Sequence, residues 1–261
     1  PGPEADTDWQ EGGFPEVILD ADTITAGPPA EPGRLTITNC STRELTAIVE
    51  EVRWVRDALT ADKVTALQAF RDLFSDQVLR PGDEVSVRRV AFMFTDLRGS
   101  TALYSRIGDA TAYHLVREHF AFLASIVRAH NGAIVKTIGD AIMAAFGDPA
   151  DALRAALAIQ DGVRAFNAET GEDDLVIKVG LHQGPSIAVT LNERLDYFGS
   201  TVNMAARVQA ESHGGDIVLS RDIAEDAAVA PLLEPYTIKS ESIALKGFAE
   251  PVTLLRLEPK S

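Results

Sequence analysis

The stretch FTDLRGST, residues 94–101, combines residue types that bind metal ions and phosphate groups. Asp96 follows a hydrophobic run, and Gly99, Ser100 and Thr101 lead into an expected helix. A carboxylate at a strand end can bind a hard cation such as Mg²⁺, and the backbone N–H groups of a turn and a helix N-terminus suit phosphate oxygens. Asp96 could equally cap the following turn, and this stretch alone leaves both interpretations open.

A second charged group stands in VKTIGDAIMAAF, where Lys136 and Asp140 interrupt an apolar run. Gly139 and the β-branched residues around it disfavour a helix and predict a tight β-hairpin with Asp140 at the turn. A charge in such apolar surroundings needs a specific partner. That partner could lie across the sheet, or Asp140 could join Asp96 so that two carboxylates hold a pair of metal ions.

The third stretch is LDYFGSTVNMAARVQ, which carries Asn203 and Arg207 four residues apart on an expected helix. The spacing puts both side chains on one face. A guanidinium suits phosphate and an amide can orient a hydroxyl, although surface helices commonly carry such pairs. Asp196 precedes the helix and could accept a hydrogen bond from a ligand amine.

Alternating strands and helices from Ser86 onward must position these residues, in the β-α-β-β-α-β order of a split βαβ unit. The predicted class is therefore α+β, a ferredoxin-like βαββαβ core with extra αβ elements. Hydrophobic patterning predicts strands over 86–97, 132–138, 141–146, 174–184 and 216–220, and two further strands within 236–257 around Lys246-Gly247. It also predicts helices over 151–166 and 200–212. Another helix is expected through the apolar residues Tyr113, Val116, Phe120, Leu123 and Val127.

Three segments are expected from the changes in composition along the chain. Residues 1–33 are rich in Pro, Gly and acidic residues and are predicted to be extended or partly disordered. Residues 34–85 are expected to hold an accessory β-hairpin around Asn39–Thr42 and a connecting amphipathic helix that starts at Thr60. Residues 86–261 then form the αβ domain.

Composition narrows the classes of partner and the compartment. The chain has 261 residues with a net charge of −15, which argues against nucleic acid or an anionic membrane as partner. No apolar run is long enough for a membrane helix. The single cysteine, Cys40, excludes an internal disulfide and fits a reducing, cytoplasmic compartment. Because the chain begins at Pro1, we expect a trimmed or excised piece with a possible regulatory domain upstream.

Five strings in order give the chain a family resemblance: FTDLRGST, VKTIGDAIMAAFG, VGLHQGP, FGSTVNMAARVQ and LKGF. Together, over residues 88–258, they resemble the class III adenylate/guanylate cyclase catalytic domain. That family closes the ribose 3′-hydroxyl of a nucleoside triphosphate onto its α-phosphorus and releases pyrophosphate. The GG(D/E)EF string of diguanylate cyclases is absent from the sequence.

The resemblance implies a role for each matching residue. Two divalent cations, Mg²⁺ or Mn²⁺, would be held by Asp96, Asp140 and the backbone carbonyl of Leu97. Arg207 would stabilise the transition state and Asn203 would orient the ribose. The phosphates would be bound by Gly99, Ser100, Thr101 and the loop residue Lys246.

Base selectivity rests on two positions in this family. Members that form cyclic AMP carry Lys at the position of Lys136 and Asp or Thr at that of Asp196, whereas members that form cyclic GMP typically carry Glu and Cys. The resemblance thus implies ATP as substrate. Since the family's sites lie between two catalytic domains and this chain has a full set, it also implies a homodimer that is required for activity.

Two other functions stay open at this point. The first is a guanylate cyclase or a cyclase of another nucleotide. The second is a non-catalytic nucleotide-binding or dimerisation module on the same scaffold.

Overall fold

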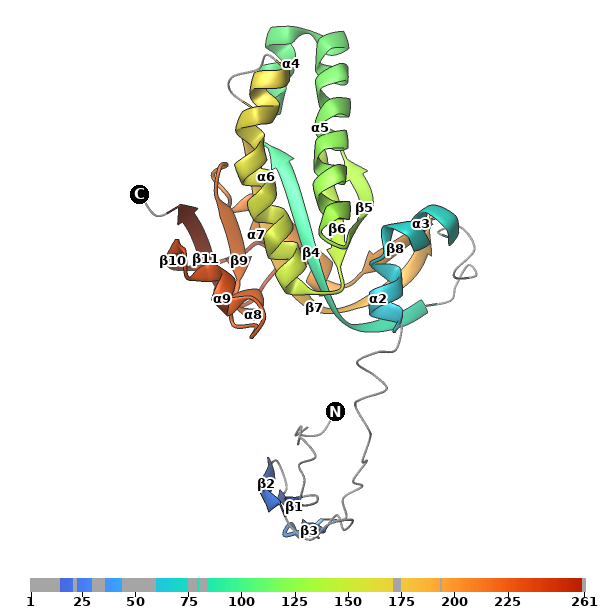
Figure 1. The fold of residues 1–261 in the computed structure, drawn as a ribbon, viewed down its shortest axis with the longest axis vertical. Coiled ribbons are helices and arrows are strands. Elements are labelled where there is room, and N and C mark those ends of the chain that lie inside the picture. The colour runs from blue at the N-terminus through green and yellow to red at the C-terminus, as the bar shows by residue number, and fades with distance from the viewer. Residues whose placement is uncertain are drawn as a thin grey trace. The chain divides into compact units, whose positions relative to one another are not determined.

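The computed structural model describes residues 15–20, 23–29, 36–43, 60–74, 79, 84–170, 175–192 and 194–259. The chain divides into two compact units, residues 1–57 and 58–261 (Figure 1). The family resemblance and every candidate site residue fall in the second unit. The expected segment boundaries at 33/34 and 85/86 stay a prediction.

The first unit contains a three-stranded sheet in the order β2-β1-β3. Strands β1 (Pro15–Asp20) and β2 (Thr23–Pro29) form an antiparallel hairpin, and β3 (Ile37–Asn39) pairs in parallel with β1. The sequence prediction placed no sheet within residues 1–33 and a hairpin around Asn39–Thr42. In the structure, Asn39 instead ends β3, and its side-chain oxygen accepts a hydrogen bond from the backbone of Ser41 at 2.9 Å. The second strand of the predicted hairpin lies outside the described residues.

The second unit is built on the predicted ferredoxin-like core. Strands β4 (Glu84–Leu97), β5 (Gly132–Ile138), β6 (Ala141–Phe146) and β7 (Ile177–Leu191) form an antiparallel sheet in the order β7-β4-β6-β5. Residues at the centre of β4, such as Phe92 and Met93, are fully buried because both faces of this sheet are covered. The predicted α+β class and core topology are confirmed.

Further strands extend this sheet beyond β7. Strand β9 (Ile217–Ser220) pairs in parallel with β7, and β11 (Val252–Pro259) and β10 (Tyr236–Ile243) follow outward as an antiparallel pair. The short strand β8 (Arg194–Phe198) folds back antiparallel onto the end of β7. Strand β8 was not predicted from the sequence, and it carries Asp196.

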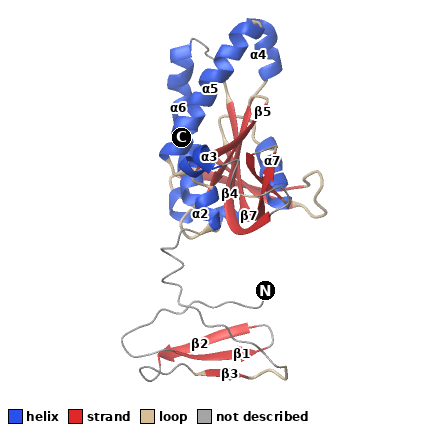
Figure 2. Cartoon of the chain, turned by 90° about the vertical axis from the view of Figure 1, so that its right-hand side faces the viewer, coloured by secondary structure: helices blue, strands red, loops and turns tan. Residues whose placement is uncertain are grey.

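Helices cover the two faces of the sheet (Figure 2). Helices α5 (Asp109–Ala129) and α6 (Pro149–Thr170) pack on one face around Leu123, Phe146 and Ile159. Helix α7 (Ser200–Ala210) lies on the other. Tyr113 was expected on the buried face of α5 but is 67% exposed, whereas Ala112, Leu115 and His119 are buried. The remaining helices are α4 (Ser100–Ile107), α8 (Arg221–Ala224) and α9 (Ala230–Leu233).

The helix expected from Thr60 onward is instead two short helices, α2 (Ala61–Thr65) and α3 (Gln68–Phe74). Thr65 ends α2, and its carbonyl accepts a hydrogen bond from the side chain of Arg71 at 2.7 Å. Leu67 and Phe74, two of the apolar residues that recur at three- or four-residue steps in this segment, are 39% and 46% exposed. In the part of the chain that the structure describes, no helix is long and apolar enough to cross a membrane.

Candidate active site

The two predicted metal ligands lie at the same end of neighbouring strands. Asp96 is the penultimate residue of β4, and Asp140 occupies the turn between β5 and β6. Because Thr95 pairs with Ile142 across β4 and β6, the register places Asp96 and Asp140 at the same end of these strands. Gly139 permits the turn through its positive φ of 63°.

The charges of the two aspartates are coupled. Burial and then the charge of Asp140 raise the pKa of Asp96, against the lowering effects of Lys178 and of the hydrogen bond from the Leu97 backbone. Two carboxylates held this close favour a bound cation, since it removes their repulsion. Of the groups that bind divalent ions in proteins, hard oxygen ligands such as these suit Mg²⁺ or Mn²⁺.

The surroundings of Asp140 contain buried polar atoms without a protein partner. Within the described residues, Asp140 Oδ2, the Tyr104 hydroxyl and both ring nitrogens of His119 are buried without a hydrogen bond of good geometry, although Tyr104 faces the Asp140 carboxylate and His119 faces the Asp140 backbone. Burial, reinforced by the charge of Asp140, raises the pKa of Tyr104 to about 12. Burial lowers the pKa of His119 to about 4, and Asp140 opposes that shift. Buried polar atoms are normally hydrogen-bonded, so Asp140 Oδ2, whose neighbour is the Tyr104 hydroxyl, has room for a further partner such as a metal ion.

Sequence reasoning missed Tyr104 and His119 as neighbours of Asp140. Burial of His119 could have been predicted from the sequence, because it stands four residues from both Leu115 and Leu123 on the buried face of α5. No group of three or more His, Cys, Asp or Glu side chains with metal-binding geometry occurs among the described residues. The protein side chains that could bind a metal ion here are therefore the two carboxylates. A backbone carbonyl and the phosphates of the substrate could supply further oxygen ligands.

The phosphate-binding residues predicted from the sequence begin α4. Gly99 has a φ of 70°, which favours glycine, and its carbonyl accepts hydrogen bonds from the N–H groups of Ala102 and Leu103 at 3.0 and 3.1 Å. Ser100 and Thr101 form the first turn, where backbone N–H groups lack intrahelical acceptors. Leu97, the proposed carbonyl ligand, is buried and pairs with Ile177 on β7.

The two predicted base-reading residues are in direct contact. Lys136 Nζ on β5 lies 2.6 Å from Asp196 Oδ2 on β8. The other carboxylate oxygen of Asp196 accepts a hydrogen bond from the backbone N–H of Tyr197 at 2.7 Å. The Lys136 side chain is 39% exposed and that of Asp196 only 11% exposed. A fixed acceptor thus stands beside an ammonium that has further N–H groups to donate.

Asn203 and Arg207 project from α7, and both are exposed. The helix packs closely on β7, because a Cβ added at Gly180 would overlap the backbone of Gln209. Among the described residues, no hydrogen bond or ion pair joins either side chain to Asp96, Asp140, Lys136 or Asp196. Within one chain the predicted residues therefore form separate groups.

Lys246 lies far from the metal ligands in the order of strands. It is exposed in the turn between β10 and β11, at one edge of the sheet, whereas Asp140 adjoins β5 at the other edge. In the sheet order, strands β9 and β7 separate β11 from β4, which leads to Gly99, and the role of Lys246 stays a prediction. His182 is buried, and its ring nitrogen Nδ1 lies 2.7 Å from the Ser220 hydroxyl.

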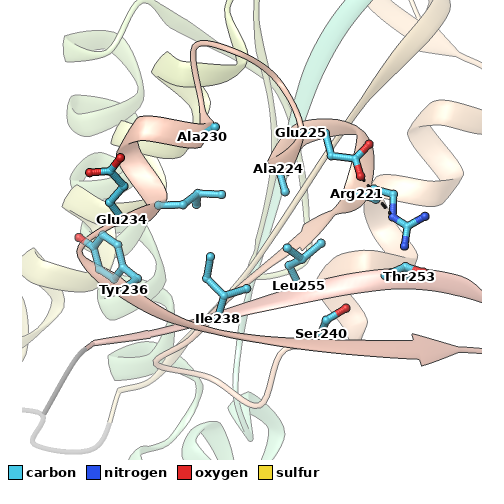
Figure 3. A pocket seen from close by; sticks show the side chains of 11 residues that line it. Arg221, Ala224, Glu225, Ala230, Glu234, Tyr236, Ile238, Ser240, Thr253 and Leu255 are labelled. Atoms are coloured by element: carbon cyan, nitrogen blue, oxygen red, sulfur yellow. Dashed lines mark ion pairs between the residues drawn. The ribbon is translucent and has the colours of Figure 1, made fainter.

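Two surface hollows of the described chain lie elsewhere. One, of about 550 Å³, is bounded by α8, α9, β10 and β11, and Arg221 and Glu225 form an ion pair at its rim (Figure 3). The other, of about 590 Å³, lies beside Arg88, Arg89 and His182. Neither is lined by a predicted site residue.

Comparison with known proteins identifies the family. The model of the adenylate and guanylate cyclase catalytic domain matches residues 83–249, which is more than half of the chain. The chain belongs to this family. Cyclase catalytic domains generally depend on divalent metal ions, bind a nucleotide substrate and typically work as dimers.

Two relatives named adenylate cyclase illustrate the similarity. The protein from Lachancea kluyveri is 32% identical over 182 residues, which cover 60% of this chain and 10% of the relative. That from Anabaena cylindrica is 26% identical over 190 residues, or 66% of this chain and 37% of the relative. The chain thus spans well under half of either relative.

Solved cyclase structures show the same fold. The adenylyl cyclase CyaB from P. aeruginosa is 21% identical with a TM-score of 0.60, over 69% of this chain and 97% of that one. The guanylate cyclase domain from Catenaria anguillulae, solved with GTP, is 22% identical with a TM-score of 0.60, over 68% and 100% of the respective chains. Since this fold occurs in both adenylate and guanylate cyclases, the fold alone does not determine whether ATP or GTP is the substrate.

Proposed function

We propose that this cyclase domain is an adenylate cyclase, which converts ATP into 3′,5′-cyclic AMP and pyrophosphate. The observation that carries the proposal is the Lys136–Asp196 pair, 2.6 Å apart. An ammonium donor beside a carboxylate acceptor complements adenine, which offers a ring nitrogen acceptor and a 6-amino donor. Guanine has a ring N–H donor and a 6-oxo acceptor at these positions. It would therefore place a donor against Lys136 and an acceptor against Asp196.

Each remaining candidate residue then has a task in positioning the triphosphate. Asp96 and Asp140, with the Leu97 carbonyl, would hold two divalent cations, Mg²⁺ or Mn²⁺. When bound, these ions lower the pKa of the ribose 3′-hydroxyl and offset phosphate charge. The N–H groups of Gly99, Ser100 and Thr101 suit the phosphate oxygens, as does the Lys246 ammonium.

Arg207 and Asn203 act on the reacting centre itself. In the proposed reaction the 3′-oxygen attacks the α-phosphorus, the bond to the leaving pyrophosphate breaks, and the hydroxyl proton passes to solvent water. The guanidinium of Arg207 would stabilise the negative charge on the phosphoryl oxygens. The amide of Asn203 would orient the ribose so that the 3′-oxygen stands in line.

We propose that these groups come together only in a homodimer. Asn203 and Arg207 are exposed on α7, no hydrogen bond or ion pair among the described residues joins them to the metal or base residues, and neither surface hollow contains a site residue. In each of two equivalent sites, one chain would supply Asp96 and Asp140. The partner subunit would supply its base-reading pair, its asparagine and its arginine.

A cytoplasmic location follows from this substrate, since ATP and divalent cations are abundant there. The single cysteine agrees with a reducing compartment. We also propose that residues 1–57, with their own small sheet, form an accessory module. A regulatory domain upstream remains part of the proposal.

Product analysis tests the proposed activity. Purified protein would be incubated with each of the four nucleoside triphosphates and Mg²⁺ or Mn²⁺, and the products identified by chromatography and mass. We expect cyclic AMP from ATP and none from the Asp96→Ala variant. Preferential formation of cyclic GMP would support a guanylate cyclase, and nucleotide binding without turnover would support a non-catalytic module.

A further inference from the structure

Helix α3 contacts both strands that carry the base-reading pair. Its residues Gln68 and Arg71 are three apart and lie on the same face of the helix. Gln68 contacts β5, which holds Lys136, and Arg71 contacts β8, which holds Asp196. The helix lies ahead of residues 83–249, the part of the chain that matches the cyclase family.

Gln68 hydrogen-bonds the backbone of β5 at an irregular point. Its side-chain oxygen accepts from the N–H of Ile134 at 2.8 Å, while its nitrogen donates to Asp72 at 2.7 Å. The cross-strand register of β5 and β6 shifts between Ile134 and Lys136, as in a β-bulge. A bulge re-aims the side chains that follow it. Because β5 is an edge strand, Gln68 is well placed to hold this bulge and hence the direction of Lys136.

Arg71 holds β8 in a comparable way. Arg71 as a whole residue is 5% exposed, and its guanidinium donates to the carbonyls of Leu195 and Thr65, each at 2.7 Å. The same group lies 5.1 Å from the centre of the Tyr197 ring. The two residues that flank Asp196 are therefore both in contact with Arg71. A buried guanidinium is costly when it loses hydrogen bonds. Because Nη2 of Arg71 has no hydrogen-bond partner among the described residues, the bonds of Nε and Nη1 to Thr65 and Leu195 are the ones that hold it in place.

We propose that Gln68 and Arg71, together called the α3 clamp, are positioning residues for base recognition. The clamp fixes the spacing between Lys136 and Asp196, and this spacing determines how strongly ATP is preferred over GTP. The inference rests on the proposed adenylate cyclase function. Neither clamp residue touches the substrate, so the effect passes through β5 and β8.

Kinetic selectivity tests the clamp. Gln68→Met and Arg71→Met remove the polar contacts with little change in volume, and Arg71→Lys retains one donor. Changes to residues that orient metal ligands, which is a comparable supporting role, typically cost about 10–100-fold. We expect kcat/KM for ATP to fall in that range mainly through KM, with a smaller fall for GTP, and we expect Arg71→Lys to be intermediate. The exposed Leu73→Ala on the same helix is the matched control and should behave as wild type.

Three results separate the outcomes. An unchanged ratio of kcat/KM between ATP and GTP in folded, dimeric Gln68→Met and Arg71→Lys would overturn the clamp, even if Arg71→Met fails to fold. A fall in thermal stability with an unchanged ratio would show a purely structural role and would likewise overturn it. If the wild type forms no cyclic AMP, the proposed function fails, and calorimetric binding of ATP and GTP to the same variants still decides whether the clamp sets the preference.

Discussion

Lys136 Nζ and Asp196 Oδ2 lie 2.6 Å apart, although 60 positions separate the two residues in the sequence. The contact joins the edge strand β5 to the short strand β8. It places a donor and an acceptor side by side before any ligand binds, which reduces the ordering that a base must impose. The arrangement leads directly to a prediction about base selectivity.

Exchange of this pair should change the preferred nucleotide. Lys136→Glu alone places a second carboxylate beside Asp196, so we expect kcat/KM for ATP to fall by about 100-fold or more. The double variant Lys136→Glu, Asp196→Cys restores a compatible pair and should favour GTP. Steady-state kinetics with both nucleotides measures this. A double variant that still prefers ATP would show that other residues read the base.

Mixed dimers should recover activity that neither parent has. We expect Asp96→Ala and Arg207→Ala each to be nearly inactive, because every site of a homodimer lacks one essential group. Random mixing makes about half of the dimers heterodimers, each with one intact site of two, so about a quarter of wild-type activity should return. Cyclic AMP formation after mixing and re-equilibration is the readout. Absence of recovery, with dimers present by light scattering, would contradict the shared site.

Gly180→Ala should weaken catalysis without touching a site residue. The added methyl group would overlap the backbone of Gln209 and push α7 away from β7. Since α7 carries Asn203 and Arg207, we expect kcat to fall by about 10-fold or more, because small misplacements of catalytic groups are costly. Overpacking should also lower stability by about 1–3 kcal/mol.

The matched control for this change is Gly147→Ala. A methyl group there would meet Lys63 at an ordinary contact distance of 3.7 Å. Its kcat and its thermal unfolding should stay near those of the wild type. Equal effects of the two substitutions would contradict the role given to the close approach of α7.

Asp216 should make stability depend on acid pH. Burial alone would raise its pKa, but hydrogen bonds from Ser212 and the His213 backbone, together with Arg256, lower it below 3.8 overall. A carboxyl with a depressed folded-state pKa stabilises the fold fully above its unfolded pKa. That stabilisation is lost as the pH falls through the folded-state pKa.

Asp216→Asn tests this dependence. The change leaves the buried Arg256 without its ion-pair partner, so we expect a loss of about 3–5 kcal/mol at pH 7. Urea unfolding between pH 7 and pH 3 should show that the difference between wild type and variant shrinks toward the acid end. A difference that stays constant down to pH 3 would contradict the assigned pKa shift.

The core and several of its site residues could be predicted from the sequence for local reasons. Gly139-Asp140 between two β-branched or apolar runs indicates a hairpin turn, and the apolar run before Asp96 indicates a buried strand. These patterns fix where the residues sit along an element. The ferredoxin-like order then follows from the alternation of strands and helices.

The rest depends on contacts that are distant in sequence. Strand β8 has the sequence RLDYF, too short and too charged for a strand pattern, and it forms because it pairs with β7. The break between α2 and α3 was missed because the apolar spacing continues through Leu67. The hydrogen bond from the Arg71 side chain to the Thr65 carbonyl at this break is a side-chain contact that the spacing does not indicate. The contact of Lys136 with Asp196 likewise arises only when β5 and β8 come together.

The ratio of kcat/KM for ATP to kcat/KM for GTP tests the central claim most directly. It would be measured on purified protein with Mg²⁺ or Mn²⁺, at several protein concentrations and with identified cyclic products. The account predicts cyclic AMP, a ratio of at least about 10 because a mismatched donor–acceptor pair is rejected strongly, and a specific activity that rises with dimer formation. A ratio below one, or no cyclic product at any concentration, would contradict it.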